Sequence, residues 1–329
     1  MSSAAKVPGG GVLPESIREQ LPPIRIQQFA FPLALLTMIV VGSIAYPQFH
    51  TTANVRNVLT FASIPLIVAL GQTVVVLARG ADLSVGSMIA LSGAILGELF
   101  VIKHVSLALT FVICIGVGVL LGGMVNGLIV TKLRVSFIIV TLGTFSIFRS
   151  LADVIINGTS ISVYNPTLDW MTNGQIGSIP VLIVIAVVFY LVMLAVLRGT
   201  TFGRSVYAVG ANPEAARLSG IPVHRIVIAG YAICGGLAAF AGILTVGQLG
   251  SAQPTAGVSA ELNSLAAVLL GGTRFSGGHG GVTGTVMGVL FLGTLTNLLL
   301  IAGVNSFWQG TASGLVLITA VALDRTRRD

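Results

Sequence analysis

The sequence predicts an all-α integral membrane protein, and its composition is the first reason. Hydrophobic residues make up 54% of the 329 residues and charged residues only 8%, whereas a soluble domain carries about 25% charged residues. The apolar residues gather in runs long enough to cross a bilayer core, which takes about 20 helical residues. Glycine is also abundant, with 41 residues, and it lets membrane helices approach one another closely.

About ten apolar runs are candidate membrane helices. The sixth is the clearest, because residues 179–197 contain no charged side chain, and the eighth is short. In chain order the predicted runs are 29–45, 58–78, 84–101, 105–130, 135–156, 179–197, 226–248, 262–270, 282–301 and 307–323. We expect one membrane domain over 29–325, no soluble domain, and short polar tails at 1–28 and 326–329.

Two junctions between these runs are short or interrupted by glycine. They are residues 80–84, between the second and third runs, and residues 271–278, between the eighth and ninth. Such interruptions are typical of broken or re-entrant helices in transporters. The predicted total is therefore ten spans, give or take one or two.

The basic residues indicate the orientation of the chain. If the N-terminus is inside, the predicted outer segments hold only Arg56 and Lys103, and the inner segments hold most of the other Lys and Arg residues. This asymmetry follows the positive-inside rule and predicts that both termini are cytoplasmic. The net charge of +7 does not indicate nucleic-acid binding, because no basic stripe with interleaved aromatic residues is present.

The basic loop 198–225 contains the pattern of a short capped helix. Asn212 is a suitable N-cap, Pro213 suits the first turn, and Glu214 favours the positive end of the helix dipole. Gly220 is a plausible C-terminal cap. A short capped helix in a loop is a rigid knob that can enter a cleft on a partner. The alternative is a surface helix that rests on lipid headgroups.

Asp82 lies beside the expected start of the third helix, close to Ser84. Its carboxylate can cap that helix or pair with Arg79. The functional alternative is a part in gating, since Gly80 and Gly86 flank the carboxylate as candidate hinges.

Three ionisable residues, Glu98, Arg149 and Asp153, fall within predicted membrane spans, where such residues are costly and face a partner or an aqueous path. Arg149 and Asp153 are four residues apart, so we expect an ion pair on one helix face. Glu98 lies near the outer end of its helix, where its side chain can reach the membrane–water interface. The sequence shows no chain of acidic and histidine residues suited to a proton relay.

Four segments, taken in order, resemble the permeases of ATP-binding-cassette (ABC) importers for monosaccharides of the ribose, xylose and galactoside type. They are residues 80–87, 126–144, 214–220 and 266–280. The resemblance implies a permease fold similar to that of type II importers. It also implies that the segment 214–220 docks on an ATPase through Glu214, Ala215, Ala216 and Gly220, and that Gly80, Asp82, Ser84 and Gly86 form a signature and gating segment.

The resemblance further implies partners. Two permease chains, expected to be identical, would form a pore in the inner (plasma) membrane. Cytoplasmic ATPase subunits would carry ATP-Mg, and a periplasmic sugar-binding protein would deliver the substrate. We expect no cofactor or metal on this chain and no catalytic site, because neither a phosphate-binding loop nor a cluster of metal-binding residues occurs in the sequence.

A path for a sugar requires hydroxyl, amide and aromatic groups within the membrane. The sequence offers Asn126, Thr141, Thr144, Phe145 and Asn297 as candidates, although each could equally serve packing or interhelical hydrogen bonding. Two alternatives stay open. One is an ion-gradient-driven secondary transporter, which would depend on Asp153 or Glu98; the other is a related ABC permease for amino acids, against which the segment around Asp82 argues.

Overall fold

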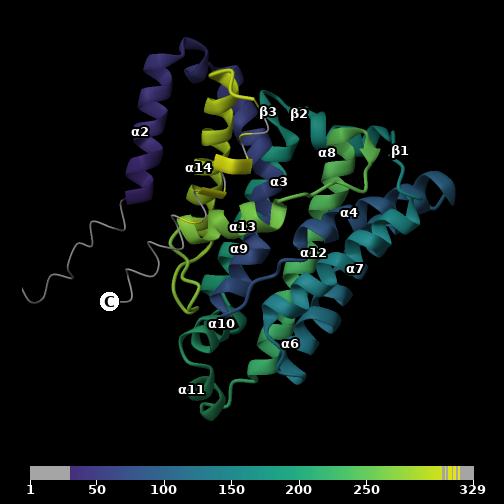
Figure 1. Ribbon diagram of the computed structural model, residues 1–329, viewed down its shortest axis with the longest axis vertical. Helices are drawn as coiled ribbons and strands as arrows, with labels where there is room; N and C mark the ends of the chain where they lie inside the picture. The colour runs from purple at the N-terminus through teal and green to yellow at the C-terminus, as the bar shows by residue number, and fades with distance from the viewer. Residues whose placement is uncertain (1–29, 306–307, 309, 313, 316–317, 319–329) are drawn as a thin grey trace, which may run out of the picture.

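The computed structural model describes residues 30–305, 308, 310–312, 314–315 and 318, and it shows a bundle of long helices (Figure 1). The first half contains α2 (Ala30–Ala45), η2 (Pro47–His50), α3 (Thr52–Leu77), α4 (Val85–Leu96), η3 (Gly97–Ile102), α5 (Leu107–Leu120), η4 (Leu121–Gly127), α6 (Leu128–Lys132) and α7 (Phe137–Ile155). The second half contains α8 (Pro166–Asn173), α9 (Val181–Gly199), α10 (Thr201–Ala211), α11 (Pro213–Leu218), α12 (Val223–Leu249), α13 (Ala260–Leu270) and α14 (Val282–Ile301). Four two-residue strands complete it, namely β1 (Ile161–Ser162), β2 (Gln175–Ile176), β3 (Ile179–Pro180) and β4 (Ser251–Ala252).

The all-α membrane fold is confirmed. Within the described residues, 7 helical segments are long and apolar enough to cross a membrane. They correspond to the predicted runs from the second to the seventh and to the ninth. The first predicted run is the shorter helix α2. The tenth run, 307–323, lies largely outside the described residues, as do the predicted tails 1–28 and 326–329.

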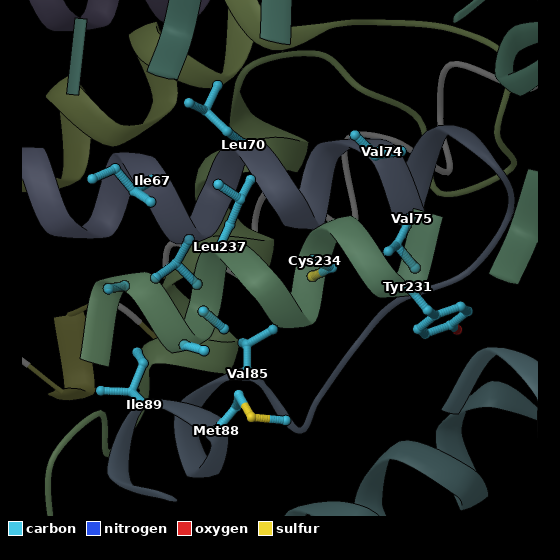
Figure 2. Packing of buried hydrophobic residues seen from close by; sticks show 14 of the residues in the cluster. Ile67, Leu70, Val74, Val75, Val85, Met88, Ile89, Tyr231, Cys234 and Leu237 are labelled. Atoms are coloured by element: carbon cyan, nitrogen blue, oxygen red, sulfur yellow. The ribbon is translucent and has the colours of Figure 1, made fainter. Parts of the chain in front are cut away.

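Helix α12 is the centre of the bundle. It packs against α3, α4, α5 and η4, and Figure 2 shows its buried side chain Tyr231 beside Val75 of α3 and its Leu237 near Ile67 and Leu70 of the same helix. Against α5 the contact is between backbones, because a Cβ at Gly235 would clash with the neighbouring helix. Small residues at such contacts let membrane helices approach closely and so gain van der Waals packing energy.

Helix α13 matches the short eighth run and has only 11 residues. At 1.5 Å per residue it is about 16 Å long, roughly half of the bilayer core. It packs between α3 and α14, and the prediction that this segment is broken or re-entrant stays a prediction. The other interrupted junction, at 80–84, is a tight loop between α3 and the continuous span formed by α4 and η3.

The two ends of the bundle differ. At one end, which we call the α8 end, α8 packs on α9 and α12, and two antiparallel strand pairs, β1 with β4 and β2 with β3, lie beside it (Figure 1). At the opposite end, the α11 end, α11 lies beyond α10, which packs on α9 and α12 (Figure 1). Helix α10 was not predicted from the sequence. Its signals were the N-cap Thr200, whose hydroxyl oxygen accepts from the Gly203 N–H at 3.1 Å, and the buried face formed by Val206 and Val209.

Candidate functional site

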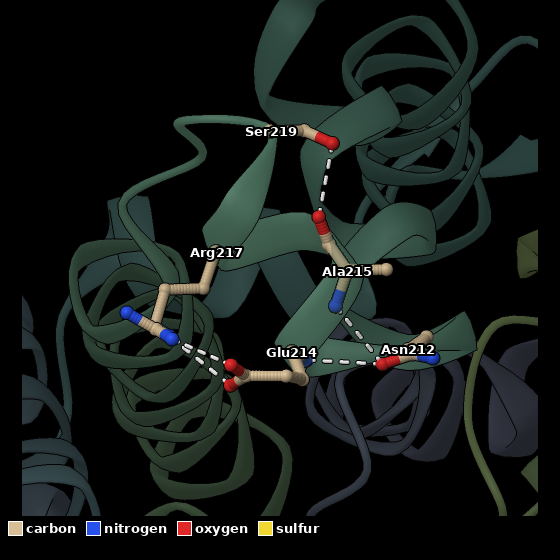
Figure 3. A network of polar contacts seen from close by, with 5 residues as sticks. All are labelled: Asn212, Glu214, Ala215, Arg217 and Ser219. Atoms are coloured by element: carbon tan, nitrogen blue, oxygen red, sulfur yellow. Dashed lines mark hydrogen bonds and ion pairs between the residues drawn. The ribbon is translucent and has the colours of Figure 1, made fainter.

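Helix α11 is the capped helix that the sequence predicts (Figure 3). The Asn212 side-chain oxygen accepts from the N–H groups of Glu214 at 3.0 Å and Ala215 at 3.1 Å. At the other end Gly220 has φ +82, and the N–H of Ile221 donates to the Ala216 carbonyl at 3.0 Å. With the bond from the Gly220 N–H to the Arg217 carbonyl, this is a Schellman cap.

The exposed part of α11 forms a small mixed surface. Of the four residues predicted to dock, Glu214, Ala215 and Gly220 are exposed, whereas Ala216 is buried and joins the main hydrophobic cluster. Ala216 therefore anchors the helix to the bundle. Leu218 is 74% exposed, and it adds an apolar side chain to this surface that the sequence did not single out.

Glu214 and Arg217 form an ion pair on α11, with 3.1 Å between Nε of Arg217 and Oε2 of Glu214. The hydrogen bond from Arg217 holds the pKa of the Glu214 carboxyl below its ordinary value. Both side chains are in water, where such pairs add little stability. Their charges are accordingly available to a partner.

A second polar cluster is buried inside the bundle. Asp82 Oδ1 accepts from the backbone N–H of Ser84 at 2.9 Å and from its hydroxyl at 2.6 Å. The Asn126 amide donates to Ser84 Oγ at 2.9 Å and to Asp82 Oδ1 at 3.3 Å, and its oxygen accepts from the Thr144 hydroxyl at 2.7 Å. These four residues, which we call the Asp82 cluster, are each at most 4% exposed.

The Asp82 cluster brings together residues that the sequence analysis assigned to different roles. Asp82 and Ser84 belong to the predicted signature, and Asn126 and Thr144 were candidates for the sugar path. In this conformation Asn126 and Thr144 are hydrogen-bonded to each other, and Asn126 also donates to Asp82 and Ser84 in the α3–α4 loop. The cluster thereby links that loop to η4 and α7, the helical segments that carry Asn126 and Thr144.

The ion pair expected between Arg149 and Asp153 is wrong, and Asp82 does not form the alternative pair with Arg79. Arg79 donates to backbone carbonyls of α10, not to Asp82, because the Asp82 carboxylate is turned into the protein towards Ser84. Arg149 donates to the carbonyls of Ala256, at 2.9 Å, and Pro254, not to Asp153. In both cases a segment far away in the sequence, the end of α10 for Arg79 and the loop after β4 for Arg149, offers backbone acceptors that the sequence does not reveal. Glu98 pairs with Lys103 at 3.4 Å.

Gly80 and Gly86 are close-packing positions in this structure. A Cβ at Gly80 would lie 2.8 Å from the Tyr231 hydroxyl. One at Gly86 would lie 2.5 Å from the Gly257 carbonyl oxygen and would clash with the Glu261 carboxylate. Each glycine thus lets a loop or helix lie directly against a neighbour.

The other path candidates are dispersed. Thr141 bonds to the Phe137 carbonyl of its own helix at 2.7 Å, and the Phe145 ring lies 5.8 Å from the Arg149 guanidinium. Asn297 exchanges two hydrogen bonds of 2.9 Å with Asn54. It also lines a cavity of about 340 Å³ between α3, α13 and α14, where Asn263 and Ser264 are further polar residues.

The fold is that of a multi-pass membrane permease, with the short capped helix α11 exposed at one end. The comparisons with known proteins agree. Residues 54–321 match the family described as the permease component of the branched-chain amino acid transport system. No solved structure matches significantly.

Among similar proteins, the ribose import permease RbsC of Haemophilus influenzae is 39% identical over 303 residues, which cover 91% of this chain and 93% of the relative. RbsC of Bacillus subtilis is 40% identical over 297 residues, covering 90% and 92%. The D-allose permease AlsC of Escherichia coli is 34% identical over 300 residues, covering 90% of each. The chain belongs to the ABC-importer permease family, in the group of the monosaccharide permeases.

Proposed function

We propose that this chain is the membrane-spanning subunit of an ABC importer that moves a monosaccharide across the inner membrane by alternating access. The observation that carries the proposal is α11, a helix capped at both ends and exposed at one end of the bundle (Figure 1). The related permeases named for ribose, D-allose and galactose support the substrate class.

In this proposal the α11 end faces the cytoplasm, as do both termini. A separate ATPase, which carries ATP-Mg, receives the exposed residues Glu214, Ala215 and Gly220. A periplasmic binding protein delivers the sugar at the α8 end, and a second copy of this chain completes the pore.

The geometry of α11 suits the transmission of force. Caps at both ends keep a short helix rigid, and the buried Ala216 fixes it to the bundle. When the ATPase subunits close on ATP, α11 moves with them as a rigid body, and the helices attached to it shift between outward and inward openings.

The test is co-purification of the ATPase with Gly220→Pro and Gly220→Asn variants. Proline holds φ near −65° and cannot adopt the +82 of Gly220, so this variant loses the cap. Asparagine tolerates the left-handed region and is the control. We expect Gly220→Pro to release the ATPase and to abolish uptake while membrane insertion persists, and Gly220→Asn to retain both. Glu214→Lys should abolish transport in the same way.

Uptake assays with ribose, allose, galactose and leucine then identify the substrate class. Preferential uptake of leucine would change the proposed substrate class from a sugar to an amino acid, in line with the description of the family. If wild type purifies without an ATPase and uptake follows an ion gradient, the ABC assignment is wrong, and Asp153 becomes the residue to substitute.

A further inference from the structure

Arg79 binds the end of α10. Its Nε donates to the Gly210 carbonyl and its Nη2 to the Ala211 carbonyl, each at 2.7 Å. These are the last two residues of α10, where helix carbonyls lack intrahelical partners and a positive charge is favoured by the helix dipole. The guanidinium therefore caps α10 from a loop that is 131 residues away in the sequence.

The backbone of Arg79 is in an unusual conformation, with φ +67. Residues with a Cβ rarely adopt this left-handed region, and such strain persists only where the surroundings impose it. Glycine would adopt the same conformation without strain. Compared with glycine, arginine at this position adds a side chain that makes two hydrogen bonds to α10.

The contact is part of a tight junction of three segments. A Cβ at Gly210 of α10 would clash with the Leu77 carbonyl at the end of α3. The Gly278 N–H, from the glycine-rich loop between α13 and α14, donates to that same carbonyl at 2.9 Å. The Tyr207 hydroxyl of α10 donates to the Gly280 carbonyl at 3.0 Å. Backbone contact at this junction leaves little room for independent motion.

The junction connects the two polar sites already described. On one side, Ala211 directly precedes Asn212, the cap of α11. On the other, Arg79 is followed within three residues by Asp82, whose carboxylate binds Ser84 and Asn126. The Arg79 side chain thus holds the end of α10 that leads into α11, and the Arg79 backbone leads into the buried cluster.

Building on the proposed function, we propose that Arg79 is a positioning residue that transmits the movement of α11 to the α3–α4 loop and the Asp82 cluster. Spatial continuity alone does not demonstrate coupling, so the test must separate coupling from folding. The measured quantity is the number of sugar molecules imported per ATP hydrolysed. A general loss of folded importer lowers both rates together and leaves that ratio unchanged.

The key variant is Arg79→Gly, which removes both bonds but relieves the backbone strain, so that loss of folding is not expected. Arg134→Gly is the matched control. Arg134 also has a left-handed φ, +55, in the loop between α6 and α7 at the α11 end. Its side chain is exposed and makes no hydrogen bond or ion pair to the rest of the described chain.

Proteoliposomes containing this chain, the ATPase and the binding protein are assayed for ATP hydrolysis and labelled-sugar uptake. We expect Arg79→Gly to keep the ATPase bound and to hydrolyse ATP, but to import about tenfold less sugar per ATP, within the usual range of coupling free energies. Arg79→Lys should recover part of the ratio, because the charge at the α10 end is kept. Arg134→Gly should match wild type.

An unchanged ratio in Arg79→Gly, or an equal loss in Arg134→Gly, would overturn the role of Arg79 while leaving the proposed function intact. A wild-type chain that captures no ATPase would overturn both. The two failures are therefore distinguishable in a single set of preparations.

Discussion

Helix α11 and the Asp82 cluster each place a carboxylate near the start of a helix, one in water and one inside the protein. The Glu214 side chain is 65% exposed and pairs with a charged arginine. Asp82 is 1% exposed, and its hydrogen-bond partners are neutral groups of Ser84 and Asn126. The same chemical group is therefore part of an exposed surface in α11 and part of a buried hydrogen-bond network in the Asp82 cluster.

The difference determines what a substitution at each site reports. Exposed ion pairs contribute little to stability, so changes on α11 should alter partner binding and leave the fold intact. Buried polar groups cost free energy when a partner is removed, so changes in the Asp82 cluster should destabilise the bundle.

The largest effect is expected for Asp82→Ala. It leaves the Ser84 N–H and hydroxyl and part of the Asn126 amide without their acceptor, and each buried donor left unpaired costs about 1–3 kcal/mol. We expect a clearly lower melting temperature of the detergent-solubilised protein, measured by size-exclusion chromatography after heating. Asp82→Asn keeps an acceptor oxygen and should lose less. A wild-type melting temperature for Asp82→Ala would show that the cluster does not stabilise the bundle.

A smaller and more local effect is expected for Asn212→Ala, and the chain offers a close control. Asn165, followed by Pro166, caps α8 at the opposite end through the N–H groups of Thr167 and Leu168, as Asn212 caps α11. Each substitution should cost its helix about 1 kcal/mol.

Only Asn212→Ala should weaken capture of the ATPase, by up to about fivefold if α11 must be helical to dock. The measurement is a binding titration of the purified ATPase against each variant. Equal weakening by Asn165→Ala would contradict the assignment of docking to α11.

The smallest effect concerns the titration of Glu214. Since the bond from Arg217 lowers the pKa of this carboxyl from its ordinary 4.5, the ion pair contributes at neutral pH and is lost as the pH falls through that lowered pKa. We expect ¹³C NMR of labelled glutamate to give a midpoint below 4.5 in wild type and a higher midpoint in Arg217→Gln. Identical midpoints would mean that the pair does not form in solution.

Local features were predictable from the sequence. Asn212, Pro213 and Gly220 correctly predicted both ends of α11, because caps depend on residues within one turn of each end. Seven of the ten apolar runs correctly predicted helices long enough to span a membrane in the described part of the chain, since a bilayer requires about 20 apolar residues in each span. Helix α10 was missed because its short amphipathic pattern lies within a basic loop.

The partners of the polar side chains were not predictable. For Arg79 the sequence offered a carboxylate three residues away, but the left-handed backbone and the packing of Gly210 against Leu77 turned the guanidinium towards α10. For Arg149 it offered Asp153 on the same helix face, but the carbonyls of a distant loop are the acceptors. Asn126 and Thr144 looked like separate polar groups and are joined by a hydrogen bond.

The sequence by itself determined the membrane helices, the capped helix α11 and membership in a permease family, because hydropathy, capping and motif order are properties of neighbouring residues. Only the tertiary structure decided that Asp82, Asn126 and Thr144 form one buried cluster and that Arg79 ties that region to α10. The physical reason is that a buried polar group takes whichever partner the packed backbone brings within hydrogen-bond distance, and most of those partners are far away along the chain.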